Sequence, residues 1–234
     1  MHLLRRYLAS VLFPARCAGC GQSVEPPSLE TPVPAVCREC IGLLERTEQF
    51  DLRGNLTEDM FAPNRQFERA AAFCFYDKHE LMSCLIQKAK YGRQPEINYE
   101  LAHMAALDGL QSDFFEDIDV IIPIPLHPRR FRQRGYNQSD YIARGLGDVL
   151  HIPVDTTHVT RVRNNPQQAL TQGKERERNV ENIFEVNHPE EMYRRHILLV
   201  DDVITTGSTI RSCMDAMSAF RGARISVFAL AKAR

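Results

Sequence analysis

The sequence has no apolar run long enough to cross a lipid bilayer, and it has almost no net charge. A membrane-spanning helix needs about 20 consecutive apolar residues, and the short run at residues 7–13 ends at Pro14. The formal charge of −1, from 29 basic and 30 acidic side chains, argues against a polycation that coats nucleic acid. Internal repeats and low-complexity tracts are also missing. With 44% apolar and 25% charged residues, the 234-residue chain has the composition of a globular protein.

The N-terminus bears a faint likeness to a signal peptide, because Arg5 and Arg6 precede the short apolar run. The run is interrupted by Ser10 and has no small-residue cleavage site in the usual pattern. We therefore expect a short amphipathic helix here and a cytoplasmic chain that does not insert into a membrane.

Four of the seven cysteines form two C-x2-C pairs that are separated by sixteen residues: Cys17, Cys20, Cys37 and Cys40. Two residues between cysteines let one tight turn direct both sulfurs at a single ion, and this spacing is typical of a tetrathiolate zinc site. Two disulfides or a redox pair are the alternatives. The weak signal peptide, the odd number of cysteines and the lack of a surrounding βαβ pattern disfavour both. Four ligands leave no open position, so the expected Zn²⁺ is structural.

Strand-like and helix-like segments alternate along the rest of the chain. Strands are expected at residues 70–76, 119–125, 154–162, 197–200 and 224–231. Helices are expected at residues 81–91, 97–110, 137–150 and 208–220. This order predicts an α/β fold, a mostly parallel twisted sheet with helices on both faces. The predicted domains are a small zinc-ribbon-like module (1–45), a connector (46–66) and the α/β domain (67–234).

A buried strand leads into two carboxylates and a hydroxyl-rich loop in the segment ILLVDDVITTGST, which starts at residue 197. Asp201 and Asp202 can accept hydrogen bonds from ribose hydroxyls, and the backbone amides at the start of the following helix can bind phosphate. Gly207 lets the backbone approach a phosphate closely. The neighbouring hydroxyl groups belong to Thr205, Thr206, Ser208 and Thr209.

This pattern favours a sugar-phosphate site over two alternatives. The acidic pair of a response-regulator receiver lies near the start of a longer domain, whereas only 32 residues follow Asp202 here. The other alternative is an ordinary strand followed by a helix that Ser208 caps.

Two polar segments with many basic side chains, 126–138 and 161–179, are expected to form loops. Residues 129–178 contain ten lysines and arginines against five acidic residues, whereas residues 94–128 contain seven acidic residues and no lysine or arginine. Ligands of parallel sheets bind at the carboxyl ends of the strands. Both basic segments are therefore expected beside the sugar-phosphate site, and a solvated basic face is the alternative.

The segment 197–209 resembles the phosphoribosyl pyrophosphate (PRPP) signature of type I phosphoribosyltransferases. With the cysteine pairs, the chain resembles the competence-associated ComF/ComFC family over nearly its full length. The further motifs that carry this resemblance are Lys90-Tyr91-Gly92, Pro123-Ile124-Pro125-Leu126, Arg134-Gly135-Tyr136-Asn137-Gln138 and Arg163-Asn164-Asn165-Pro166-Gln167-Gln168.

The resemblance implies a zinc module joined to a type I phosphoribosyltransferase-like domain that binds Mg²⁺-PRPP. The 205–209 loop is expected to take the 5′-phosphate, Asp201 and Asp202 the ribose, and segment 163–179 to act as a lid. The other candidate residues, for catalysis or for pyrophosphate, are Lys174, His127, Arg129 and Arg134.

Two functions remain open at this point. The first is a phosphoribosyltransferase, a glycosyltransferase connected with DNA uptake, natural competence or nucleotide salvage. The second is a non-catalytic competence factor that binds single-stranded DNA and uses the PRPP fold as a sensor or scaffold. In that case the stacking candidates are Tyr91, Phe131 and Tyr136, and the competence machinery is the expected partner.

Overall fold

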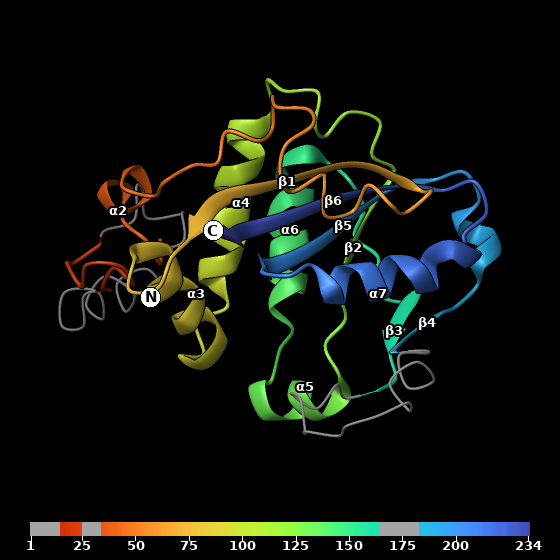
Figure 1. Ribbon diagram of the computed structural model, residues 1–234. Coiled ribbons are helices and arrows are strands. Elements are labelled where there is room, and N and C mark those ends of the chain that lie inside the picture. The colour runs from red at the N-terminus through yellow and green to blue at the C-terminus, as the bar shows by residue number, and fades with distance from the viewer. Residues whose placement is uncertain (1–14, 25–33, 164–182) are drawn as a thin grey trace, which may run out of the picture.

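The computed structural model describes residues 15–24, 34–163 and 183–234 (Figure 1). Two sequence-based expectations lie outside these ranges: the helix at residues 7–13, and the segment 164–179 that includes Lys174. Within the described ranges, no helix is both long and apolar enough to cross a membrane.

A four-stranded sheet forms the centre of the fold (Figure 1). In spatial order its strands are β1 (Phe67–Tyr76), β6 (Arg224–Ala233), β5 (His196–Ile204) and β2 (Val120–Pro123). All neighbouring strands are parallel. The two central strands, β5 and β6, are almost wholly buried, as expected for a parallel sheet that is covered on both faces.

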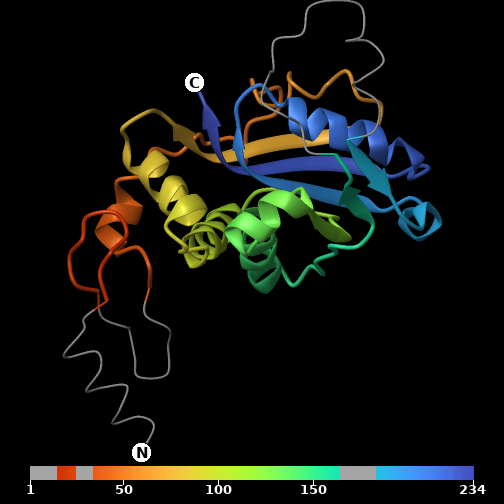
Figure 2. The same ribbon diagram turned by 90° about the horizontal axis from the view of Figure 1, so that it is seen from below.

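Helices cover both faces of the sheet, as the edge-on view in Figure 2 shows. On one face lie α3 (Leu81–Tyr91), α4 (Glu96–Gly109) and α6 (Gln138–Leu150), and on the other lies α7 (Ser208–Ala216). Successive side chains of a strand point to opposite faces. Accordingly, Leu198 and Val200 pack with the first group of helices, whereas Ile197 and Leu199 pack with α7. The expected fold class is confirmed.

The basic segment after β2 contains a helix where we expected a loop. The residue before helix α5 (Pro128–Arg134) is His127, which caps the start of the helix. The His127 Nδ1 accepts a hydrogen bond of 3.1 Å from the Arg129 amide. The helix ends at Gly135, whose φ of 85° is the left-handed conformation that glycine adopts easily. No residue of α5 is buried, so it has no apolar periodicity that could reveal it in the sequence.

The strand expected at residues 154–162 is interrupted by a turn. Val154 makes a single parallel bridge to Ile121, and the chain then bends at residues 156–158. The Asp155 Oδ1 accepts hydrogen bonds from the amides of Thr157 (2.6 Å) and His158 (3.0 Å), which fixes the turn. Only β3 (Val159–Arg161) is a strand, and it pairs antiparallel with β4 (Phe184–Val186).

The last helix and three short elements complete the description. The helix α7 stops at Ala216 rather than Phe220, and a 3₁₀ turn, η2 (Met217–Ala219), follows it. The other short elements are α2 (Arg38–Gly42) and the 3₁₀ turn η1 (Pro189–Met192). The predicted domain boundaries at residues 45 and 66 remain a prediction.

The crossing of α4 and α6 depends on a glycine. A Cβ atom on Gly145 would overlap the Tyr99 carbonyl oxygen and would lie 3.0 Å from the Ala102 Cβ. We expect Gly145→Ala to lower the free energy of unfolding by about 1–3 kcal/mol, the usual effect of overpacking. Urea denaturation measures this change. The control is Gly42→Ala, because a Cβ there would meet no atom within 4 Å, and equal effects of the two substitutions would contradict the packing argument.

Candidate functional site

The carboxyl ends of β2 and β5 open into one cavity of about 540 Å³. Two carboxylates from the end of β5, Asp201 and Asp202, line it together with Thr205 and Thr209 from the following loop and helix. Three arginines line it as well: Arg130, Arg134 and Arg161. The cavity therefore offers acceptors for hydroxyl groups and donors for anions in one place.

Asp202 forms an ion pair with a lysine that also lines the cavity. The Lys90 Nζ, near the end of α3, lies 2.9 Å from the Asp202 Oδ2. The side chains of Lys90 and Asp202 are only 23% and 12% exposed, so water screens this pair weakly.

Asp201 lies beside this pair and has an unusual protonation equilibrium. Burial, and then the charge of Asp202, raise the pKa of Asp201 to about 7. Two donors to its Oδ1 oppose this rise, the Asp202 amide at 2.9 Å and the Ser139 hydroxyl at 3.2 Å, and so does the positive charge of Lys90. The carboxyl group therefore changes charge near neutral pH.

The arginines that line the cavity are held by different contacts. Arg134 donates a hydrogen bond of 3.0 Å to Gln138, and its guanidinium carbon lies 5.3 Å from the centre of the Tyr91 ring. Arg161 lies over the Phe184 ring, also at 5.3 Å, and its buried Nε has no hydrogen-bond partner among the residues that the structure describes. Burial, and then the nearby Arg130, lower the pKa of Arg161. An anion would satisfy the open donors and relieve the repulsion between these two side chains.

The loop between β5 and α7 has the geometry of an anion site at a helix start. Gly207 has a φ of 70°, and its carbonyl oxygen accepts the hydrogen bond that the Arg211 amide donates over 2.9 Å. The amides in the first turn of a helix lack partners within that helix and can donate to a ligand. Thr206 and Ser208 hydrogen-bond to each other through their hydroxyl groups at 3.2 Å.

The structure brings part of the predicted site together at the cavity. Of the predicted residues, the cavity lining includes Arg134, Asp201, Asp202, Thr205 and Thr209. The described lining does not include His127, Arg129, Thr206, Gly207 or Ser208. His127 caps the start of α5, and burial, followed by the charge of Arg161, lowers its pKa. Lys174 lies outside the described residues.

Several lining residues were not singled out as site residues from the sequence. They are Lys90, Arg130, Asn137, Gln138, Ser139 and Arg161. Lys90 and the pair Asn137-Gln138 belong to motifs on which the family resemblance rests. Those motifs were the only sequence signal that could have marked these residues as part of the site. Arg130 adjoins the chosen Arg129, and only the helical geometry of α5 decides which of the two faces the cavity.

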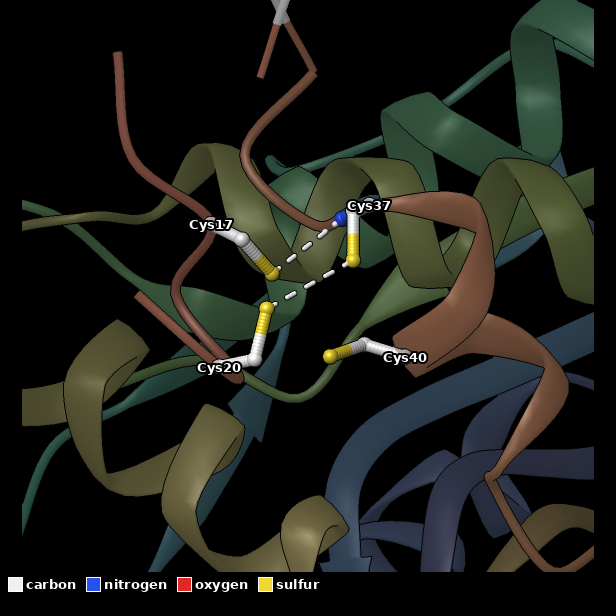
Figure 3. A group of neighbouring side chains, drawn as sticks. All are labelled: Cys17, Cys20, Cys37 and Cys40. Atoms are coloured by element: carbon white, nitrogen blue, oxygen red, sulfur yellow. Dashed lines mark hydrogen bonds between the residues drawn. The ribbon is translucent and has the colours of Figure 1, made fainter. Parts of the chain in front are cut away.

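The four cysteines of the two C-x2-C pairs form a second site beside α3. Figure 3 shows their sulfur atoms pointing toward one another, and all four lie within 4.8 Å of each other. The Sγ atoms of Cys20 and Cys37 are 3.8 Å apart. Sulfurs placed tetrahedrally around zinc at about 2.3 Å are about 3.8 Å from one another. The arrangement therefore fits a structural metal ion.

Backbone amides favour the thiolate form of one cysteine in this cluster, Cys17. The amides of Gly19 and Cys37 each donate to the Cys17 Sγ at 3.2 Å. Burial alone would raise the pKa of Cys17, but the amides of Cys37, Cys20 and Gly19 outweigh it and lower that pKa to about 6. Metal ions bind the thiolate, so these amides prepare Cys17 for a cation. Burial raises the pKa of Cys40, so that thiol gives up its proton less easily until a cation is bound.

Comparison with known proteins identifies the family of the domain that carries the cavity. Residues 97–234 match the family described as phosphoribosyl transferase domain. "Competence protein F" of Haemophilus influenzae is 36% identical over 159 residues, which are 66% of this chain and 69% of that protein. The chain belongs to the ComF family of phosphoribosyl transferase domain proteins.

Other ComF-family relatives are more distant or carry a different name. "DNA utilization protein YhgH" of Shigella flexneri is 34% identical over 64% of this chain and 67% of its own length. "Competence protein ComFC" of Bacillus subtilis is 28% identical over 58% of this chain and 52% of its own length. Among solved structures, adenine phosphoribosyltransferase of Leishmania tarentolae covers 81% of this chain and 94% of its own, with 11% identity and a TM-score of 0.39.

The cysteine cluster predicts the metal content of this ComF-family chain. Purified protein should contain about one zinc ion, and Cys37→Ser should lose it because three sulfurs remain. Elemental analysis by mass spectrometry measures the ratio. The control Cys84→Ser removes a cysteine outside the cluster and should keep the metal. Wild-type protein without zinc, or zinc retained in Cys37→Ser, would contradict the assignment.

The pKa of Asp201 predicts how one substitution changes stability with pH. Below the unfolded-state pKa of about 4, the Asp201 carboxyl group is protonated in both the folded and the unfolded protein. The stability that it contributes is lost as the pH rises through its folded-state pKa of about 7. Asp201→Asn removes this loss, so the Tm of the variant minus that of the wild type should grow from about pH 5 to pH 8. Asp215→Asn, exposed on α7, serves as the control and should give a constant difference. A Tm difference between Asp201→Asn and the wild type that narrows with rising pH would refute the raised pKa of Asp201.

Proposed function

We propose that this ComF-family chain binds Mg²⁺-PRPP in the 540 Å³ cavity and acts as a phosphoribosyltransferase-type protein in the handling of DNA or nucleotides. The observation that supports this most directly is that two carboxylates and three arginines line one cavity, together with Thr205 and Thr209 near the start of α7. PRPP carries a ribose with vicinal hydroxyls between two anionic groups, so its parts match the parts of the cavity.

Each part of the cavity has a role in this proposal. The loop at 205–209 donates backbone and hydroxyl hydrogen bonds to the 5′-phosphate. Asp201 and Asp202 accept hydrogen bonds from the ribose hydroxyls. Arg130, Arg134 and Arg161 stabilise the pyrophosphate, and Arg129 and Lys174 are kept as further candidates for it.

The proposed transfer needs fixed charges more than it needs a protein nucleophile. As the bond from the anomeric carbon to pyrophosphate breaks, positive charge develops on the ribose and negative charge on the leaving group. The two aspartates and the three arginines lie where they can stabilise these charges without reorganising. Mg²⁺, bound chiefly by substrate oxygens and water, neutralises part of the pyrophosphate charge.

Binding of single-stranded DNA is a second candidate function, and one observation favours it. Tyr91 is 73% exposed, and its ring lies under the guanidinium of Arg134, which lines the cavity. An exposed aromatic ring beside a cation is a typical stacking position for an unpaired base. Relatives named for competence and DNA utilisation support the same reading. On either candidate function we place the protein in the cytoplasm and the competence machinery among its partners.

Titration calorimetry with Mg²⁺-PRPP tests the first function. We expect the wild type to bind and Asp202→Asn to bind about 10- to 100-fold more weakly, because a charge-assisted hydrogen bond to a ribose hydroxyl is lost. Asp215→Asn, on the exposed side of α7, is the matched control and should bind as the wild type does. The absence of PRPP binding by the wild type would refute the proposal. Pyrophosphate release with a panel of nucleobases then tests turnover.

A titration with a single-stranded oligonucleotide tests the second function. Binding to a basic groove releases counterions, so the logarithm of the affinity should fall steeply and linearly with the logarithm of the salt concentration. Affinity that does not change with salt would contradict a groove that follows phosphates.

A further inference from the structure

The helix α3 connects the cysteine cluster to the PRPP cavity. Near its end, Lys90 reaches the cavity and pairs with Asp202 at 2.9 Å. Two residues earlier, the Lys88 Nζ donates a hydrogen bond of 2.5 Å to the carbonyl oxygen of Ala18, between the first two cysteines. The helix α3 precedes residues 97–234, the part that matches the phosphoribosyl transferase family. Lys90 is therefore a cation that reaches the cavity from outside the residues that match this family.

The start of α3 is packed directly on the cysteine segment. A Cβ atom added to Gly19 would lie 2.7 Å from the Cys40 Sγ and 2.9 Å from Leu81, the first residue of α3. The buried face of α3, with Leu85 and Ile86, shares one hydrophobic core with all the cysteines of the cluster except Cys20. Movement of the cysteine segment would therefore displace α3.

The end of α3 is fixed on the cavity side by two further contacts. The Tyr136 hydroxyl donates to the carbonyl oxygen of Ala89, and the Arg134 guanidinium covers the Tyr91 ring. Lys90 lies between Ala89 and Tyr91 in the sequence, so these two contacts restrict where its side chain can reach. Its ammonium group offsets one of two adjacent negative charges in a cavity that we propose to receive a polyanion.

We propose that Lys90 is a positioning residue of the PRPP site, and that the metal-bound cysteine cluster holds Lys90 on Asp202 through α3. This inference rests on the proposed function of the cavity. Metal loss would release the Ala18 carbonyl and the Leu81 contact, and α3 would no longer direct Lys90 at the carboxylates. The cavity would then bind PRPP more weakly although the residues that touch PRPP are unchanged.

Because of the charges around Asp201, the proposed role of Lys90 predicts a specific change in the pH dependence of PRPP binding. The charged or titratable groups that face it are Asp202 on β5, Lys90 on α3, Arg161 on β3 and Cys213 on α7. Of these, Lys90 favours the ionised form of Asp201 and lowers its pKa. Without Lys90 the pKa of Asp201 rises further, so PRPP binding that depends on the ionised carboxylate should shift to higher pH.

The first experiment measures PRPP affinity against pH for Lys90→Met and Lys90→Arg. We expect Lys90→Met to weaken binding about tenfold near pH 7 and to move the pH midpoint upward. The conservative Lys90→Arg should restore both values at least in part. Lys78→Met, at an exposed lysine before α3, is the control and should leave both unchanged. Equal or tighter binding by Lys90→Met, or an unmoved midpoint, would overturn the proposal.

The second experiment removes the metal with a chelator in both the wild type and Lys90→Met. If the cluster acts through Lys90, chelation should weaken PRPP binding by the wild type about as much as Lys90→Met does and should have little further effect on that variant. Equal losses in both proteins, or no loss in the wild type, would refute the coupling. Lys88→Met keeps all four cysteines, loses the bond to Ala18 and should give an intermediate loss. Circular dichroism checks that each sample is folded.

A third measurement does not need PRPP and separates this proposal from the proposed function. Acylation of lysine amines, followed by mass spectrometry, reports how accessible the Lys90 amine is, with Lys78 as the internal reference. Chelation should increase the acylation rate of Lys90 relative to Lys78, since the pair with Asp202 is released. If the wild type fails to bind PRPP but this rate rises, the proposed function fails and the link through α3 stands. If the rate does not change, the link is refuted.

Discussion

The burial of β5 between two layers of the fold is the constraint on which both the sheet and the cavity depend. Its residues 197–200 are fully buried and pack alternately on the two faces. These buried residues therefore fix the position of the next two residues of the strand, Asp201 and Asp202. Burial raises the pKa of Asp201, and it also leaves Asp202 dependent on Lys90 for its counter-ion. The position of the two carboxylates in the cavity is therefore determined by the buried apolar residues that precede them in β5.

Much of this arrangement could be predicted from the sequence because the buried elements have strong periodic patterns. The helix α3 begins and ends at the expected residues, and β5 and β6 lie where apolar β-branched runs indicated them. The elements that escaped prediction are polar or short. The helix α5 buries no residue, and its signals were the proline after His127 and the glycine at 135. The turn at Asp155 depends on side chain-to-backbone bonds that an apolar pattern does not contain.

The site could be predicted less completely than the fold, for a related reason. A motif that lies along one strand and the loop after it, such as Asp201 to Thr209, is continuous in the sequence and can be recognised from the sequence alone. Lys90 and Arg161 reach the same cavity from α3 and β3, and only the packed tertiary structure brings them to Asp202 and Asp201. A count of basic residues pointed to the segment around Arg129 and Arg130 but could not tell which arginine faces inward, since that is decided by the rotation of a short helix.

The shared core of the cysteine cluster and the sheet has a consequence for the conditions under which this protein folds. Cys17, Cys37 and Cys40 belong to the same buried cluster as Leu198 and Phe228, residues of the two central strands. An ion that binds these thiolates only when they are gathered stabilises the folded chain by mass action, in proportion to the logarithm of its free concentration. Such an ion would raise the proportion of folded chain, and its removal or the oxidation of the thiols would lower that proportion.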